Sequence, residues 1–362
     1  MNPAFATVAE LSAAFAKRTL SPVDVVNALL ERIERMNPRL HAFIDVYAAD
    51  ARLAAEAAEG AIRSGHAIGP LHGVPVALKD LVDLEGRVTT GGSKVWEKRV
   101  STVTATLARR MIAAGMIVLG KTHTVEFAMG GWGTNTHMGT PRNPWDPKVH
   151  RTPGGSSSGS GVAVSAGLAP AAIGTDTGGS VRLPASWCGI VGLKTTVGRI
   201  STYGVLPLSS TLDTPGPMTR SVKDAALLYR VLNGPDPNDR ATLAWTPDDP
   251  LPVLERGVAG LRLAVMPEVE RAGVDAEVLA AYDASVEVLR GQGATIVSLS
   301  LPNRFTDYAA STGRIIGPEG YRFVGHLVDD PSLPTDPHVR PRIQLGRGVS
   351  ARDYLFALAE CQ

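Results

Sequence analysis

The stretch from Phe127 to Gly204 constrains the fold most, because glycine, serine and threonine are frequent there in the middle of an otherwise apolar chain. A glycine-dense stretch of this kind usually brings backbone close to a ligand or to other backbone. Within it, the strand-like run 171–174 leads into the segment from Asp176 to Ser180. The apolar flanks argue against a free serine-glycine linker. We therefore expect ordered loops around a site.

Helices and strands alternate on both sides of this stretch. A helix that starts at Ser21 begins with a capping residue followed by proline, and apolar residues then recur at helical spacing. Further helices are expected over 48–64, 104–114, 221–232 and 275–290, and strands over 73–78, 116–119, 261–266 and 294–299. This alternation favours an α/β sheet with a layer of helices on each face.

Composition excludes several classes of protein. The 362 residues are 44% apolar and 20% charged, and the formal net charge of +1 gives no argument for nucleic acid or an anionic membrane. Two cysteines, Cys188 and Cys361, do not make a disulfide framework. The basic pair Lys17 and Arg18 follows the N-terminal apolar stretch, the reverse of a signal peptide. No apolar run is long enough to span a bilayer. The expected location is cytoplasmic.

Three segments could carry chemistry. In the first, Lys79 and Asp80 directly follow the apolar run 73–78. A lysine at a buried strand end is desolvated, which lowers its pKa and makes it a base near neutral pH. The alternative is a surface lysine or a partner of Asp80.

The second segment, from Pro153 to Gly161, is rich in serine and glycine. Gly155, Ser157 and Gly159 match G-x-S-x-G, which would make Ser157 the nucleophile of an α/β-hydrolase. That motif needs a preceding strand, and the prolines upstream disfavour one. No Gly-Lys-Ser/Thr follows, so the segment is not a phosphate-binding loop.

The third segment runs from Gly174 to Pro184. Two glycines before Ser180 let successive N–H groups turn toward one point, which suits an oxyanion hole beside a nucleophile. Asp176 and Arg182 could pair to hold this loop, although a tight turn with a structural salt bridge is the alternative. Together, a lysine and two serine loops suggest a serine hydrolase without histidine, in which neutral lysine deprotonates one serine and that serine deprotonates the other.

These three segments, in this order, resemble the core motifs of the amidase-signature family. The resemblance extends over nearly the whole chain, and it implies a central mixed β-sheet flanked by helices on both faces. It implies a single domain over 1–362, with a helical segment 1–66, a catalytic core 67–233 and a C-terminal α/β segment 253–362. Because family members generally continue further, the resemblance implies a C-terminal part that is truncated relative to the family.

The resemblance also implies roles for matching positions. Lys79 would be the base, Ser156 the bridging serine after a cis peptide bond, and Ser180 the nucleophile that forms an acyl-enzyme. The other expected site residues are the N–H donors and substrate contacts Thr177, Gly178, Gly179, Ser180, Gly130, Gly131 and Trp132, with Ser157, Asp176 and Arg182 in support. Cys188 is expected in the core rather than as a nucleophile. No metal or other cofactor is expected, because the eight histidines show no paired spacing.

The implied activity is hydrolysis of a carboxamide, a non-peptide carbon–nitrogen bond, with release of ammonia or an amine. The expected partner is a small-molecule amide, without nucleic acid or membrane, and a homodimer is left open. Three alternatives remain: a urea or allophanate hydrolase, a truncated inactive binding protein, and a glutaminase-type A subunit of a tRNA-dependent amidotransferase. Leu183 disfavours the last, because that protein usually carries glutamine after the matching arginine.

Overall fold

The N-terminal part is a layer of helices. The computed structural model describes residues 2–361, beginning with α1 (Val8–Ala16), α2 (Pro22–Leu40) and α3 (Ala48–Ser64). The hydroxyl of Ser21 accepts from the N–H groups of Val23 and Asp24, so it caps α2 as the sequence predicts. The buried residues of α2 recur at helical spacing and face the core, which places this layer against the sheet.

The central sheet is mixed. Its six strands lie in the order β1-β3-β2-β4-β6-β5, where β2 is parallel to both β3 and β4, and the other pairs are antiparallel. The strands are β1 (Phe43–Val46), β2 (Pro75–Lys79), β3 (Ile117–Thr122), β4 (Ala171–Asp176), β5 (Val191–Gly192) and β6 (Thr214–Thr219). Every residue of β2, β4 and β6 is buried, as expected for strands covered on both faces.

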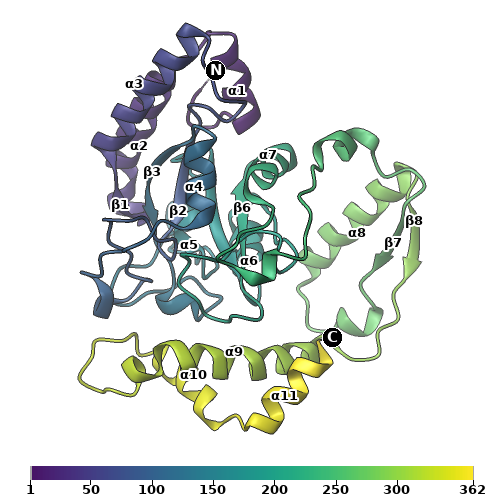
Figure 1. Ribbon diagram of the computed structural model, residues 1–362. Helices are drawn as coiled ribbons and strands as arrows, with labels where there is room; N and C mark the ends of the chain where they lie inside the picture. Colours follow the sequence, from purple (N-terminus) through teal and green to yellow (C-terminus); the bar gives the residue numbers. More distant parts are fainter. Residues whose placement is uncertain (1, 362) are drawn as a thin grey trace.

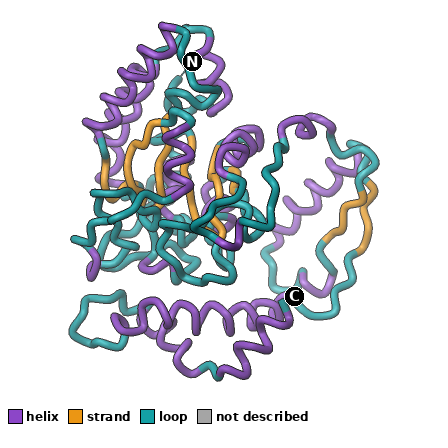
Figure 2. The backbone as a smooth tube through the Cα atoms, in the orientation of Figure 1, coloured by secondary structure: helices purple, strands orange, loops and turns teal. Residues whose placement is uncertain are grey.

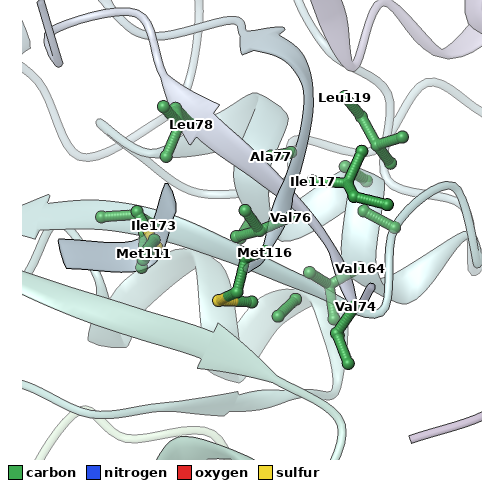
Figure 3. Close-up of a cluster of buried hydrophobic side chains, with 14 of the residues drawn as sticks. Val74, Val76, Ala77, Leu78, Met111, Met116, Ile117, Leu119, Val164 and Ile173 are labelled. Atoms are coloured by element: carbon green, nitrogen blue, oxygen red, sulfur yellow. The ribbon is translucent and has the colours of Figure 1, made fainter. Parts of the chain in front are cut away.

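Helices α4 (Thr106–Ala113), α5 (Ser158–Ser165), α6 (Arg182–Cys188) and α7 (Val222–Leu232) surround these strands. Figure 1 shows α4 and α7 beside the sheet, and α5 packs against β2, β3 and β4. Figure 3 shows the resulting core, to which β2, β3, β4, α4 and α5 all contribute apolar side chains. Each fully buried Val, Leu or Ile contributes roughly 1.5–3 kcal/mol, so this cluster fixes the positions of the central strands.

The C-terminal part forms two further pieces. Strands β7 (Arg262–Val265) and β8 (Thr295–Ser298) form a parallel pair beside α8 (Ala276–Gly291). Helices α9 (Phe305–Val328), α10 (Arg340–Gln344) and α11 (Ala351–Glu360) then run across the lower edge of the molecule in Figure 1. Among residues 2–361, no helix has both the length and the apolar character needed to cross a bilayer.

The sheet positions two of the chemistry-bearing segments at one edge. Because β2 and β4 are adjacent and parallel, their carboxyl ends, Lys79 and Asp176, meet at the same edge of the sheet. Figure 2 shows loops gathered at this edge, between the strands and α9. The expected helices over 48–64, 104–114, 221–232 and 275–290 and the expected strands over 73–78, 116–119, 171–174, 261–266 and 294–299 are confirmed, with every end within three residues of the expected one.

A substitution at Gly159 in α5 tests how tightly this core is packed. A Cβ atom there would lie 2.3 Å from the carbonyl oxygen of Ala42 and 2.4 Å from the amide nitrogen of His123. We expect Gly159→Ala to destabilise the protein by about 1–3 kcal/mol, as overpacking does. Urea unfolding measures this, with Gly313→Ala in α9 as the control, because nothing lies within 4 Å of its added Cβ. Equal stability of the two variants would contradict the packing described.

Candidate active site

The amine of Lys79 is the centre of the site. It lies at the end of β2 with a fully buried side chain, and Nζ lies 2.8 Å from Oγ of Ser156 and 2.8 Å from Oγ1 of Thr175. Burial lowers the pKa of Lys79 to about 7, although the negative charges of Asp213 and Asp176 oppose this shift. A large fraction of Lys79 is therefore neutral near pH 7 and able to accept a proton.

Asp80 does not pair with Lys79, which removes the alternative interpretation of this segment. Its carboxylate instead lies 3.1 Å from Nζ of Lys121, in a fully buried ion pair that connects the end of β2 to β3. Thr90 also donates to Asp80 through both its hydroxyl and its N–H. The two adjacent residues therefore differ in their contacts: Asp80 holds the strands together through Lys121, and Lys79 contacts Ser156 and Thr175.

Ser156 lies directly before α5 and is fully buried. The Gly155–Ser156 peptide bond is cis. The carbonyl of Ser156 accepts from the N–H of Val125 at 3.1 Å and from the hydroxyl of Thr124 at 3.0 Å, so its backbone is held on the side of β3. Its hydroxyl is thereby directed at Lys79.

Ser157 is occupied by structural bonds. Its hydroxyl accepts from the N–H of Thr175 and lies 3.2 Å from the carbonyl of the same residue, which fixes the start of α5 to β4. The side chain is fully buried. This arrangement argues against Ser157 as a nucleophile, despite its match to G-x-S-x-G, and agrees with the supporting role expected for it.

Ser180 lies on the loop between β4 and α6 and is 8% exposed. Its carbonyl accepts from the N–H of Ser157 at 3.2 Å, which brings the two serine loops together. Asp176 and Arg182 form a two-contact ion pair across this loop, at 2.9 and 3.0 Å. Burial raises the pKa of Asp176, but hydrogen bonds from Arg182 and from backbone N–H groups outweigh burial and leave that pKa below its ordinary value. Asp176 therefore stays ionised and holds the loop.

The oxyanion donors expected from the sequence need one correction. The N–H of Gly179 donates to the carboxylate of Asp176 at 2.7 Å, so this N–H is engaged in holding the loop and is not free to donate to an oxyanion. Within residues 2–361, the N–H groups of Thr177, Gly178 and Ser180 have no protein acceptor. All three lie in the turn that carries Ser180, so their N–H groups are the ones available to an oxyanion there.

The loop of Gly130, Gly131 and Trp132 lies beside the two serine loops. The carbonyl of Gly131 accepts from the N–H of Gly155 at 2.7 Å. Cβ atoms added at Gly131 and Gly179 would each lie 3.2 Å from Cδ1 of Leu183, so this leucine fills the space between the two loops. Trp132 is 57% exposed and packs on Trp187, with 5.7 Å between ring centroids. An apolar strip therefore leads outward from the Ser180 loop.

Two residues near Lys79 were not singled out from the sequence. Thr175 lies near the end of β4, directly before Asp176, and its hydroxyl contacts the lysine amine. Asp213 precedes β6, and its carboxylate accepts from the hydroxyl of Thr177 and from the N–H groups of Leu208 and Ser209. The position of Thr175 beside Asp176, at the end of an apolar run, was a usable signal for it. Nothing local distinguishes Asp213 from other loop aspartates.

Cys188 lies in the core, as expected. It is fully buried, and burial raises the pKa of its thiol to about 12, so the thiolate form needed of a nucleophile is absent at neutral pH. Its Sγ lies 3.4 Å from the carbonyl of Pro153. The cysteine therefore packs the segment before Ser156 against α6 and has no role as a nucleophile.

Comparisons with known proteins agree with this geometry. Residues 24–316 match the family described as Amidase. Two A subunits of glutamyl-tRNA(Gln) amidotransferase are similar to this chain. The one from Halorhodospira halophila is 42% identical and is matched over 93% of this chain and 71% of its own length. The one from Roseiflexus castenholzii is 43% identical, with 97% and 74% covered.

A solved structure also superimposes closely, with a TM-score of 0.92 at 34% sequence identity. The match covers 98% of this chain and 76% of that one. It is described as a vestigial protein complex that reveals the evolutionary origins of an s-triazine catabolic enzyme. The mixed sheet with helices on both faces, as expected from the sequence, is therefore shown.

The expectation for partners is wrong. The sequence favoured a small-molecule amide alone, without nucleic acid and with a homodimer left open. The relatives are instead named as one component of a multi-subunit enzyme, and that enzyme is named for glutamyl-tRNA(Gln). Balanced net charge misled the prediction, because the net charge of one chain carries no information about what its partner chains bind.

The pH dependence of Ser180 reactivity tests the geometry. If neutral Lys79 is the base, the rate at which a fluorophosphonate probe labels Ser180 rises with pH and levels off above about 7. Lys79→Met should lower the rate about 10²–10⁴-fold, as loss of a general base does, and should remove this rise. The rate is measured by mass spectrometry of the labelled peptide. A rise centred near the ordinary lysine pKa of 10.5 would contradict the assignment.

Proposed function

The chain belongs to the amidase family, and on that premise we propose that it hydrolyses a carboxamide through Ser180, Ser156 and Lys79. The observation that carries the proposal is the contact between a desolvated lysine amine and the hydroxyl of a buried serine. An amine with a pKa near 7 can take a proton from Ser156 without a histidine. The loop on which Ser180 lies is attached to the residue after Ser156, because the N–H of Ser157 donates to the carbonyl of Ser180 at 3.2 Å.

The reaction proceeds through two transfers of acyl groups. Lys79 takes the proton of Ser156, Ser156 takes that of Ser180, and Ser180 Oγ forms a bond to the carbonyl carbon. The N–H groups of Gly178 and Ser180 stabilise the oxyanion. Collapse breaks the carbon–nitrogen bond, the proton returns through Ser156 to the leaving nitrogen, and ammonia departs. Water then attacks the acyl-enzyme along the same proton path and releases the carboxylic acid.

The favoured role is that of a glutaminase-type subunit, which releases ammonia for use by a partner protein. The similarity to the A subunits of amidotransferases, at 42% and 43% identity, supports this role. The position of an arginine also supports it: Nη1 of the exposed Arg342 lies 3.2 Å from the position that a Cβ on Gly130 would take. A guanidinium beside this loop can bind the α-carboxylate of an amino-acid amide such as glutamine in two-contact fashion.

The apolar strip favours a second candidate, an amidase that acts alone on an apolar carboxamide. Leu183 fills the space beside the Ser180 loop, and the half-exposed Trp132 and Trp187 continue the apolar surface outward. These side chains suit an alkyl or aromatic acyl group better than a zwitterionic amino-acid amide. The two candidates share the chemistry at the carbonyl and differ in the group beside it and in the use of a partner protein.

Ammonia release separates the candidates. The purified chain is assayed with glutamine and with a set of alkyl and aryl carboxamides. We expect release from glutamine, with a higher KM in Arg342→Ala, because the α-carboxylate loses its partner. Preference for apolar amides, with no effect of Arg342→Ala, would favour the second candidate.

Ser180→Ala is the control for both candidates and should abolish release from every substrate. Release that survives this change would contradict the proposed chemistry itself.

A further inference from the structure

A buried glutamate connects α9 to the loop 208–213. Glu319, on α9, accepts from the hydroxyls of Ser209 and Thr211, from the N–H of Thr211 at 3.1 Å and from the hydroxyl of Tyr354 at 2.7 Å. Three of these four donors belong to the loop, and Tyr354 belongs to α11. Burial raises the pKa of Glu319, but the hydrogen bonds from Ser209, Thr211 and Tyr354 outweigh burial and leave it below its ordinary value. An ionised carboxylate with four donors is a strong and specific attachment.

The same loop holds Asp213. One oxygen of the Asp213 carboxylate accepts from the backbone N–H groups of Leu208 and Ser209, at 2.8 and 3.0 Å, so the loop that Glu319 fixes also fixes this carboxylate. The N–H of Asp213 in turn donates to the carbonyl of Ser209. The path from Glu319 to Asp213 is therefore a short series of hydrogen bonds within one loop.

Asp213 acts on the catalytic groups in two ways. Its other oxygen accepts from the hydroxyl of Thr177 at 2.5 Å, and Thr177 begins the loop that carries Gly178 and Ser180. Burial is the main influence on the pKa of Lys79, and ionised Asp213 is the largest influence that opposes it, ahead of Asp176. Burial raises the pKa of Asp213 itself, while its hydrogen bonds and the nearby Lys79 favour its ionised form. A displaced Asp213 would therefore change both the shape of the oxyanion loop and the basicity of Lys79.

We propose that Glu319 is a positioning residue for the reaction: from α9, through the loop 208–213, it holds Asp213 where that carboxylate orients Thr177 and faces Lys79. The inference rests on the proposed function, since it assigns Glu319 a task in the same site. Packing agrees with it, because Ile316, one turn before Glu319, lies against Gly178, and Gly320 lies against Leu208. Helix α9 thus contacts both the loop 208–213 and the oxyanion loop.

The test uses fluorophosphonate labelling of Ser180 in the full chain, because this readout needs no knowledge of the natural substrate. Asp213→Asn removes the charge beside Lys79, so the rise of the labelling rate should move to lower pH; Asp176 remains as the other charge near the amine. Glu319→Gln should move the rise in the same direction and lower the maximal rate about 10- to 100-fold, as small misplacements of reacting groups do.

Asp336→Asn is the matched control. Asp336 accepts from the N–H and the hydroxyl of Thr136, both at 2.8 Å, so it attaches the α9–α10 region to the core without touching the loop 208–213. We expect it to lower the thermal midpoint while leaving the pH of the rise unchanged. A role of Glu319 in folding alone would make the two variants alike.

Thr211→Val and Tyr354→Phe each remove one donor to Glu319 and keep the proposal testable if Glu319→Gln does not fold. Both should move the rise in the direction of Asp213→Asn, by less than Glu319→Gln. If the labelling rate rises at the wild-type pH in every folded variant of the Glu319 contacts, the inference is overturned. The proposed function then still stands, because the wild type is labelled at Ser180. Absence of labelling at Ser180 in the wild type would instead overturn the proposed function, and the inference with it.

Discussion

Removal of the Lys79 amine from water is the interaction on which the rest of the site depends. Burying an ammonium group costs several kcal/mol unless the group gives up its proton, and here the surroundings offer two hydroxyls at 2.8 Å and only two more distant carboxylates. The balance of these effects places the pKa of Lys79 at about 7. A closer ion pair would have left a permanently charged lysine, and Asp80 avoids this by pairing with Lys121.

The fold supplies this environment through its central strands. Parallel pairing of β2 with β4 places Lys79 next to Thr175 and Asp176. One serine loop leads into α5, and the other begins where β4 ends. The apolar core fixes the strands, while the polar contacts fix the loops. Helix α9, far along the chain, completes the same edge of the sheet through Glu319 and Ile316. Apolar packing thus fixes the sheet, and polar contacts from the loops and α9 fix the groups of the proposed reaction.

The sequence predicted those helices, strands and site positions that depend on local residue patterns. Strand β2 follows from a short apolar run, α2 from its cap and its apolar periodicity, and α3 from its alanine content, while the proposed triad positions follow from three ordered motifs. Helix α5 was not foreseen, because its serines and glycines disfavour helix. The close contact with Ala42 and His123 accounts for Gly159 alone. The remaining features depend on long-range contacts and could not be predicted from local sequence. Asp213 and Glu319 act through partners that are distant in sequence, and the hydrogen bond from Gly179 to Asp176 is visible only in three dimensions.

Direct titration of the Lys79 amine would test the central claim most directly. Protein labelled with [ε-¹³C]lysine can be followed by NMR across the pH range, and the Lys79 resonance assigned by its loss in Lys79→Met. The structure predicts a midpoint near 7, far from the ordinary lysine value. A midpoint near that ordinary value of 10.5 would mean that Lys79 is charged at neutral pH and cannot be the base that activates the serines.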